Sequence, residues 1–304
     1  MNSKSTNNDS QAGLRSAAAA DGSVLDLVTQ QLPEFNKSFR KVAAYLLSNP
    51  DAFMRKPLQE IALNVGVSQP SVVRFCRHFG FKGVPDFRIG LATSLARGGM
   101  GRSAIFIEPG VTDKATMNLA RKRAIAKHAV SLLGADRALI LDSGSTSQLF
   151  AEELKTAKPL TILTTGFNSI ETLRSASQHT VMIPGGTVRY ESNSVTGRMA
   201  EAAVKSMRFD TFYLGVDAID IEHGLSAFNE DEAHQNAAMM NACERVVVLS
   251  DSSKFRAPAL HRICHIDRVH AIVTDSGLSD ELTQLIEAKG VVVHRVETAQ
   301  DEEK

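Results

Sequence analysis

The stretch LQEIALNVGVSQPSVVRFCRHFGFKG, residues 58–83, decides the fold of the first part of the chain. In its first half, apolar residues recur at i, i+3, i+4 and i+7, the spacing of one helix face: Leu58, Ile61, Ala62 and Val65. Gly66 ends that helix, Ser68 is placed to cap the next one, and Pro70 falls in a first turn, where proline is tolerated. The second helix has its own apolar stripe, formed by Val72, Cys76 and Phe79. This pattern predicts a helix-turn-helix, whose second helix lies in a DNA major groove.

The polar positions around the second helix are the ones available to DNA. Hydroxyl and amide side chains near its start suit base edges, whereas Arg74, Arg77 and Lys82 suit phosphate. The predicted DNA-binding residues are therefore Ser68, Gln69, Pro70, Ser71, Arg74, Arg77, His78 and Lys82. The alternative is a plain helical hairpin with solvated arginines.

Charge divides the chain into two parts. Residues 1–104 carry 13 Lys/Arg and 7 Asp/Glu, and residues 105–304 carry 21 and 27, although the net charge of the whole is zero. A basic first part joined to an acidic remainder indicates that only the first part meets a polyanion. A chance fluctuation is the alternative interpretation.

Length and composition exclude several classes of protein. The chain has 304 residues, of which 43% are hydrophobic and 22% charged, as in ordinary two-domain globular proteins. No apolar run approaches the roughly 18 residues of a membrane span, and the block Ala17 to Ala20 is too short for a signal peptide. Three scattered cysteines, Cys76, Cys243 and Cys264, form no disulfide framework. We expect a cytoplasmic protein with no membrane association.

Beyond the break Gly98-Gly99-Met100-Gly101, short apolar runs alternate with helical stretches. The runs are residues 138–141, 161–164, 181–183, 211–214, 246–249, 271–274 and 291–294. Such alternation predicts a mainly parallel sheet covered by helices. The expected organisation is a disordered tail (1–23), an all-α helix-turn-helix domain (24–96), a linker (97–112), an α/β domain (113–297) and a polar tail (298–304).

Several turns rich in Gly, Ser and Thr directly follow predicted strands. The loop 142–146 follows one strand and opens a helix, so its N–H groups and hydroxyls form an anion site. Similar turns occur at 164–166, 184–187 and 214–217. The carboxyl ends of parallel strands share one edge, where ligands bind. For any one loop, a tight connection without a ligand is the alternative.

Other chemistry has weaker support in the sequence. The residues His261, Cys264, His265 and His270 lie in a predicted strand, whose side chains alternate between faces, so no metal site is predicted. Neither Ser143 nor Ser145 lies in a Gly-x-Ser-x-Gly elbow. We therefore expect no catalytic residue and no cofactor. The acidic residues Asp210, Asp217, Asp220 and Glu222 leave open a general base for sugar isomerisation.

Residues 24–96 resemble the helix-turn-helix domain of RpiR-type bacterial regulators. The resemblance rests on FNKSFRKVAAYLLSNPDAF (35–53), on the stretch 58–83 and on FRIGLA (87–92). It implies that the helix from Ser68 to Phe79 reads DNA and that the preceding helices form its supporting bundle.

Residues 113–297 resemble the effector domain of DeoR-type regulators, for example in RKRAIAKHA (121–129), LDSGST (141–146), VMIPGGTVR (181–189) and RVVVLSDSSKF (245–255). The resemblance implies a sugar-phosphate isomerase-like fold that senses a phosphorylated sugar. It further implies that the loop 143–146 holds the phosphate, that the turn 185–186 lets the backbone approach the sugar, and that acidic and basic side chains line the pocket. The predicted effector site comprises Ser143, Gly144, Ser145, Thr146, Thr165, Gly185, Gly186, Asp217, Glu232 and Lys254.

The chain departs from both families. RpiR-type domains usually precede a different sugar-phosphate domain, so the chain resembles a hybrid. Asn236 stands where the DeoR type often has lysine, and Thr164-Thr165-Gly166 replaces Thr-Asn-Ser.

These observations predict a sequence-specific, DNA-binding transcriptional regulator, expected to repress carbohydrate-metabolism genes under the control of a phosphorylated sugar. The competing hypothesis is a sugar-phosphate isomerase-like enzyme with a helical appendage, in which a DNA-binding domain has no obvious use. The expected partners are double-stranded operator DNA, a small phosphorylated metabolite and further copies of the chain in a dimer or tetramer, because such domains usually act on paired half-sites.

Overall fold

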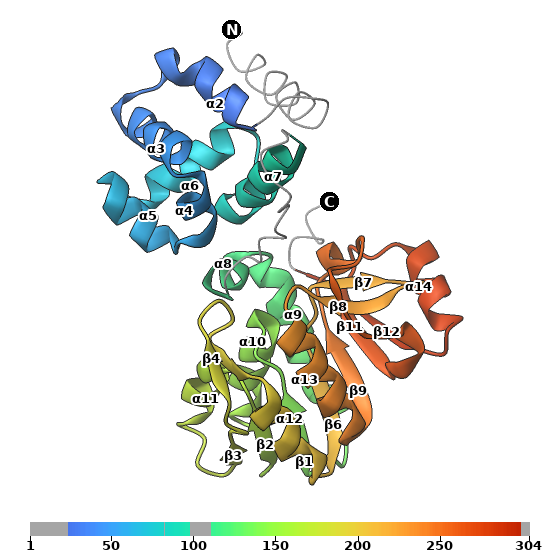
Figure 1. Cartoon of the computed structure of the whole chain (residues 1–304). Helices are drawn as coiled ribbons and strands as arrows, with labels where there is room; N and C mark the ends of the chain where they lie inside the picture. The colour runs from blue at the N-terminus through green and yellow to red at the C-terminus, as the bar shows by residue number, and fades with distance from the viewer. Residues whose placement is uncertain (1–23, 82, 98–110, 299–304) are drawn as a thin grey trace, which may run out of the picture. The chain divides into compact units, whose positions relative to one another are not determined.

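The computed structural model describes residues 24–81, 83–97 and 111–298 (Figure 1). The chain forms two compact units, residues 1–114 and 115–304. The predicted tail 1–23, Lys82, the segment 98–110 of the predicted linker and residues 299–304 lie outside the described residues.

The first unit is helical throughout its described part. Its elements are α2 (Val24–Gln31), the 3-10 turn η1 (Leu32–Glu34), α3 (Lys37–Ser48), α4 (Pro50–Arg55), α5 (Leu58–Val65), α6 (Gln69–His78) and α7 (Val84–Arg97). Asn36 caps α3 by accepting a hydrogen bond from the backbone N–H of Phe39 at 2.9 Å. Gly66 ends α5 in the left-handed conformation, with a φ of +67°, which glycine adopts without steric cost.

An aromatic core holds this bundle together. Phe35, Phe75, Phe79 and Phe87 are buried and meet mostly edge to face. The buried guanidinium of Arg88 donates to the carbonyl oxygens of Phe53 and Lys56, which ties α7 to α4. The packing fixes which face of α6 is turned away from the core.

The second unit alternates strands and helices, after the short helix α8 (Val111–Thr116). Its helices are α9 (Leu119–Ala129), α10 (Ser145–Leu154), α11 (Phe167–Leu173), α12 (Arg198–Lys205), α13 (Glu230–Asn241) and α14 (Asp280–Glu287). Short 3-10 turns are η2 (Val130–Leu132), η3 (Ser252–Lys254) and η4 (Ile266–Arg268). Its strands are β1 (Ala138–Leu141), β2 (Thr161–Thr164), β3 (Thr180–Met182), β4 (Thr187–Arg189), β5 (Ser194–Thr196), β6 (Phe209–Leu214), β7 (Ala218–Asp220), β8 (Gly224–Ala227), β9 (Cys243–Leu249), β10 (His261–Cys264), β11 (Ala271–Asp275) and β12 (Val292–Val296).

Seven of these strands form one parallel sheet in the order β12-β11-β9-β6-β1-β2-β3. The chain moves from β1 through β2 to β3 in one direction and from β6 to β12 in the other. The point where the strand order reverses therefore lies between β1 and β6, the position where open α/β sheets bind ligands. Smaller antiparallel sheets, β10-β8-β7 and β4-β5, complete the unit.

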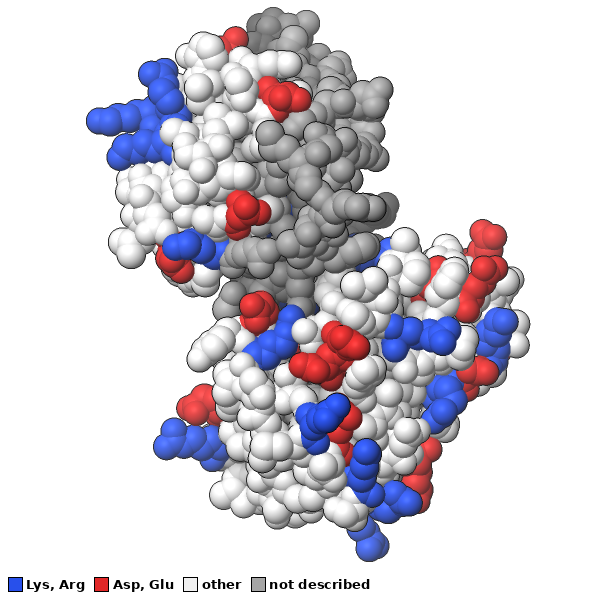
Figure 2. All heavy atoms as spheres, in the orientation of Figure 1, with Lys and Arg blue, Asp and Glu red and all other residues white. Residues whose placement is uncertain are grey.

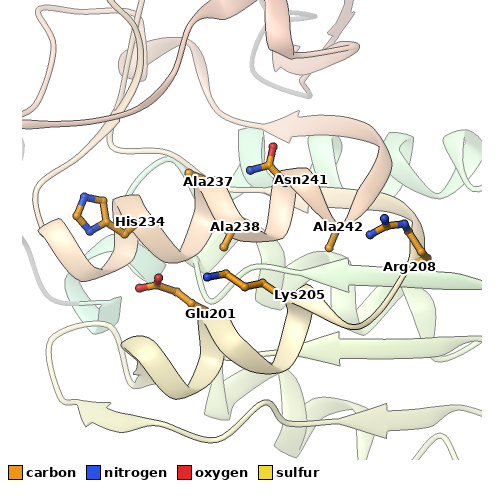
Figure 3. Close-up of a pocket in the computed structure, with 8 residues that line it drawn as sticks. All are labelled: Glu201, Lys205, Arg208, His234, Ala237, Ala238, Asn241 and Ala242. Atoms are coloured by element: carbon orange, nitrogen blue, oxygen red, sulfur yellow. The ribbon is translucent and has the colours of Figure 1, made fainter.

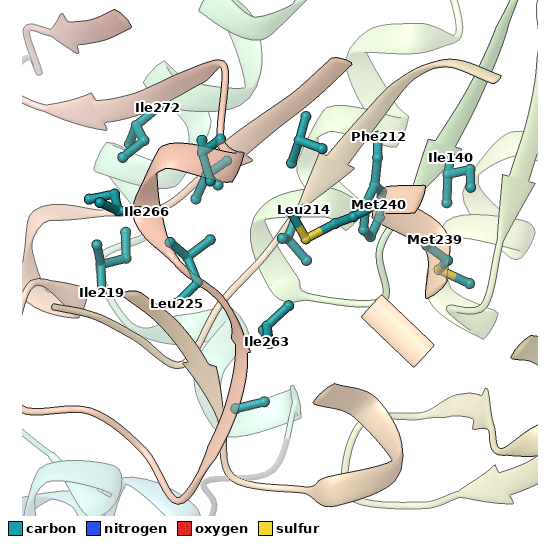
Figure 4. Close-up of a cluster of buried hydrophobic side chains, with 14 of the residues drawn as sticks. Ile140, Phe212, Leu214, Ile219, Leu225, Met239, Met240, Ile263, Ile266 and Ile272 are labelled. Carbon is teal, nitrogen blue, oxygen red and sulfur yellow. The ribbon is translucent and has the colours of Figure 1, made fainter. Parts of the chain in front are cut away.

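Two apolar clusters fill the space on either side of the large sheet. One includes Ile125 from α9, Phe150 from α10 and Leu173 from α11. The other includes residues from α12, α13 and α14 and from the β7-β8-β10 sheet, such as Val204, Met239, Ile286 and Ile219 (Figure 4). The unit is thus a three-layer α/β/α fold, and the predicted fold class is confirmed.

All seven predicted strands of the parallel sheet are present, but the sequence missed the hairpin β4–β5 and the antiparallel pair β7–β8. Asn118, which has a φ of +52°, separates α8 from α9. Asparagine tolerates this left-handed conformation better than most residues, so the break costs little. Among the described residues, no helix has the length and apolar character needed to cross a bilayer.

Candidate functional site

The outward face of α6 carries most of the predicted DNA-binding residues. Val72, Phe75 and Cys76 are buried against the bundle, whereas the exposed positions are Ser68, Gln69, Pro70, Arg74, Arg77 and His78. Figure 2 shows a group of Lys and Arg side chains projecting from one side of the first unit. The local fold thus presents a polar, cationic helix face that fits a major groove in shape and charge.

Four of the predicted residues make side-chain contacts within the protein: Ser68, Ser71, Arg74 and His78. The hydroxyl of Ser71, which is only 7% exposed, lies 2.9 Å from the hydroxyl of Ser68 and accepts a hydrogen bond from Arg74 at 3.3 Å. The ring of His78 lies 2.8 Å from the amide oxygen of Gln31 and meets Phe35 edge-on. The side chains of Ser71 and His78 therefore order the reading helix. Lys82 lies outside the described residues.

The structure adds a cation that the sequence did not single out. The ammonium of Lys41, on α3, lies 3.6 Å from the position that a Cβ would take on Gly66. Lys41 is exposed, so its charge sits beside the turn between α5 and α6.

In the second unit, the predicted anion loop lies at the carboxyl end of β1, beside the reversal in strand order. Gly144 is the N-cap of α10, and its extended backbone leads directly into Ser145. A carboxylate oxygen of Asp142 accepts the backbone N–H of Gly215, which follows β6, at 3.0 Å. The structure thus brings the loops after β1 and β6 together at the helix start, where an anion is favoured.

A buried lysine reaches this loop from α9. The ammonium of Lys122, whose residue is 4% exposed, donates to the hydroxyl of Ser145 at 3.0 Å. This contact places a positive charge at the start of α10, where charge-assisted hydrogen bonds favour an anion. Lys122 was not among the predicted residues.

The sequence nevertheless held a signal for Lys122. With Ile125, Ala126 and Ala129 it forms the i, i+3, i+4, i+7 pattern of a buried helix face, and all four are buried. A lysine on such a face must find a polar partner inside the protein.

The loop after β2 closes over the same region. A Cβ on Gly166 would lie 2.9 Å from the Cα of Ser143, so only glycine allows this approach. Thr165 is buried, and its carbonyl accepts the backbone N–H of Val195, in β5, at 3.0 Å. The loop residues after β1 and β2 therefore lie together, and the loop after β2 contacts β5.

The anion loop is closed in this structure. Asp142, Ser143, Ser145 and Thr146 are each 7–8% exposed. The neighbouring loops and Lys122 cover these side chains, and their predicted role at the ligand edge of the sheet stays a prediction. The hydroxyl of Ser147 is also buried and has no hydrogen-bond partner among the described residues.

The remaining predicted effector residues lie at the same edge of the sheet or close to it. Gly186 has a φ of +138°, and a Cβ there would lie 2.5 Å from the carbonyl oxygen of Thr196, so the β4–β5 hairpin itself requires this glycine. Gly185 also has a positive φ, +77°. Asp217 is buried and accepts the backbone N–H of Phe228 at 3.1 Å.

Two charged residues complete the predicted set. Glu232, in the first turn of α13, pairs with Arg189 of β4 at 3.1 Å, and both side chains are mostly buried. Lys254 lies in η3, two strands from the anion loop, after β9. Its predicted role in the effector site therefore rests on its place in the fold.

A second network fastens α9 to the same edge. Arg121 donates to the hydroxyl of Ser252 at 3.1 Å and lies 3.5 Å from the carboxylate of Asp275. Asn118 donates to the carboxylate of Asp251 at 3.0 Å. The first turn of α9 is thus held to the ends of β9 and β11, while the adjacent Lys122 holds the anion loop after β1.

Comparison with known proteins gives two family matches. Residues 22–98 match the helix-turn-helix domain of the rpiR family, and residues 117–276, more than half of the chain, match the DeoR C-terminal sensor domain. The chain belongs to the DeoR family. Its DeoR-type sensor domain is joined to an rpiR-type helix-turn-helix, which is the domain composition of a DNA-binding transcriptional regulator.

Two relatives named as transcriptional regulators, and one solved structure of an isomerase, illustrate what the chain is similar to. The "Putative aga operon transcriptional repressor" of Escherichia coli O157:H7 is 38% identical over 187 residues, which are 62% of this chain and 70% of that protein. The HTH-type transcriptional regulator GlpR of Haloferax volcanii is 28% identical over 249 residues, 82% of this chain and 93% of that protein. Ribose 5-phosphate isomerase A from Methanocaldococcus jannaschii aligns with a TM-score of 0.33 and 19% identity, over 44% of this chain and 53% of that chain.

Proposed function

We propose that this DeoR-family repressor binds operator DNA through the exposed face of α6 and that a phosphorylated sugar bound at the loop 142–146 controls this binding. The regulated genes are expected to serve carbohydrate metabolism. Operator binding would place its action in the cytoplasm.

The DNA-reading part of the proposal rests on the face of α6. Gln69 and Ser68 lie exposed at the helix start, where amide and hydroxyl groups reach base edges. Arg74 and Arg77 lie farther along, exposed and suited to phosphate. We assign sequence preference to the first pair and salt-dependent affinity to the second.

The effector part is carried by one observation: the buried ammonium of Lys122 lies 3.0 Å from the hydroxyl of Ser145, the first residue of α10. A phosphate at this helix start would gain the helix N–H groups, the hydroxyls of Ser145 and Thr146, and the charge of Lys122. An uncharged sugar would gain little from the same groups, so the site favours phosphorylated ligands.

Because the loop is buried, a ligand must open it in order to bind. Lys122 and Arg121 are neighbours on α9, so an opening that shifts Lys122 also shifts the contacts that Arg121 makes with Ser252 and Asp275. A ligand with different affinities for the closed and opened states shifts their populations, which is the requirement for an effector.

The proposal is tested with full-length protein and an operator selected from random duplex DNA. Fluorescence anisotropy of the labelled operator is followed during titration with pentose and hexose phosphates and, as controls, the same sugars without phosphate. We expect at least one phosphate ester to change the operator Kd while its parent sugar does not. A response to the parent sugar alone, or to neither ligand class, would remove the assignment of the effector.

A further inference from the structure

The outer face of α12 and α13 carries opposite charge at its two ends. The helices lie side by side and run in the same direction, with Glu201 level with His234 and Arg208 near Ala242 (Figure 3). The end where both helices begin carries the partly or fully exposed residues Glu201, Glu230 and Asp231, against one cation, Arg198. The end where the helices finish carries exposed Lys205 and Arg208.

Between these ends the surface is hollow and built from small residues. A pocket lies between the helices. It is lined by three alanines and by longer polar or charged side chains: Ala237, Ala238, Ala242, Glu201, Lys205, Arg208, His234 and Asn241. Small side chains allow a second helix to approach closely, since the distance between helix axes depends on the residues at the contact. Met199, in the first turn of α12, is 68% exposed and adds apolar area to the same helix.

We propose that this surface, the α12–α13 face (Glu201, Lys205, Arg208, Glu230, Asp231, His234, Ala237 and Ala238), binds the same face of a second copy of the chain. A two-fold axis near Ala237 sets the acidic end of one copy against the basic end of the other. Glu201 then meets the partner subunit's Lys205, and Asp231 meets the partner subunit's Arg208. The same rotation makes the helix dipoles of the two copies antiparallel, which is favourable.

A second copy fits this face better than a small anion does. Lys205 and Arg208 lie where α12 and α13 end, and the free carbonyl groups of helix ends repel anions. A two-fold pair of identical surfaces satisfies both signs of charge at once. It would also supply the paired reading helices that helix-turn-helix proteins use on symmetric half-sites.

The test uses charge exchange in the full-length protein, followed by sedimentation velocity and light scattering across micromolar concentrations. The wild type is expected to be dimeric or a multiple of the dimer. Lys205→Glu alone, or Glu201→Lys alone, places like charges together and should raise the dimer Kd at least about tenfold. The double variant Glu201→Lys/Lys205→Glu restores opposite charges across the axis and should regain wild-type association.

Two further variants separate association from folding. Lys127→Glu makes the same charge reversal on the exposed surface of α9 and should leave association unchanged. Ala238→Gln fills the hollow without changing charge and should weaken association, while the thermal unfolding temperature reports whether each variant is folded. A monomeric wild type, an unchanged dimer in Lys205→Glu, or a double variant that stays dissociated would each overturn the proposal. None of these measurements depends on DNA or on an effector.

Discussion

The two units present their functional groups in opposite ways. In the first unit, Arg74 and Arg77 stand exposed on α6, over an aromatic core that is already closed. In the second unit, Ser145 and Thr146 are buried, and Lys122 already donates to one of them. The surface that we assign to DNA is therefore preformed, whereas the loop that we assign to the effector is buried and, in this proposal, opens to bind.

This difference suits a regulator. A preformed reading helix loses little conformational entropy when DNA binds, so its affinity is available without a ligand. A loop that opens only for its ligand links binding to a change of conformation. The predictions below test this contrast, in order of decreasing expected effect.

The largest effect is expected where the buried charge is removed. Lys122→Met keeps a long side chain in the helix face but removes the ammonium, and charge-assisted hydrogen bonds contribute about 1.5–3 kcal/mol each. The affinity for a sugar phosphate should therefore fall by about 10- to 100-fold in calorimetry, with DNA affinity unchanged in the absence of effector. Wild-type ligand affinity in this variant would mean that Lys122 serves only the packing of α9.

The next effect concerns the exposed arginines. Replacing both Arg74 and Arg77 with Ala should weaken binding to every duplex similarly, by about tenfold, because phosphate contacts carry little sequence information. The slope of log K against log salt should fall in magnitude by about 0.9 per lost contact. Anisotropy titrations at several salt concentrations measure both quantities, with Arg123→Ala on α9 as the matched control. A loss confined to one DNA sequence would show that these arginines read bases instead.

A smaller effect is expected where Arg121 joins the first turn of α9 to the ends of β9 and β11. Arg121→Met breaks the contacts to Ser252 and Asp275 but leaves Lys122 in place, and partly exposed ion pairs contribute about 0.2–1 kcal/mol. The effector should bind Arg121→Met as it binds the wild type, but its influence on operator Kd should change by up to about fivefold. Arg123→Met, two residues along the same helix, should behave as wild type. If the effector changes operator Kd equally in the wild type, Arg121→Met and Arg123→Met, the contacts of Arg121 on α9 take no part in the coupling between effector and DNA.

The smallest effect is a pH dependence of sensor stability. Burial, together with the nearby ring of His128 at 5.1 Å, lowers the pKa of His294. Because the folded pKa lies below the unfolded value, the contribution to stability is fully present above about pH 6.5 and is lost as pH falls. The urea midpoint of the second unit should thus drop between pH 7.5 and 5.5, and less so in His294→Gln. An identical drop in that variant would assign the effect to other groups.

The sequence predicted the architecture well because its signals were local. Apolar runs marked all seven strands of the parallel sheet, and the spacing of Leu58, Ile61 and Val65 marked the helix before the turn. It did not predict the β4–β5 hairpin, whose strands are three residues each, or the break at Asn118, which depends on a single left-handed residue. Elements this short leave no periodic pattern to detect.

The sequence predicted which residue types form each site, but not the contacts or the burial of those residues. The Gly/Ser/Thr composition located the anion loop, yet only the packing of α9 shows that Lys122 reaches it and that Ser145 is buried. In the same way, His78 is a polar residue on α6, but its ring nitrogen contacts the amide oxygen of Gln31, 47 residues earlier in the chain. Contacts between residues distant in sequence decide such details.

The central claim is that an effector opens and occupies the loop 142–146 while the reading helix stays preformed. Hydrogen–deuterium exchange of the full-length protein, with and without the sugar phosphate that changes operator binding, tests it most directly. We predict that the amides of residues 143–147 and the first turns of α9 change their exchange rates when the ligand binds, whereas those in the interior of α6 do not. Unchanged exchange at residues 143–147, with the ligand-dependent change located in another loop of the sensor, would contradict the account.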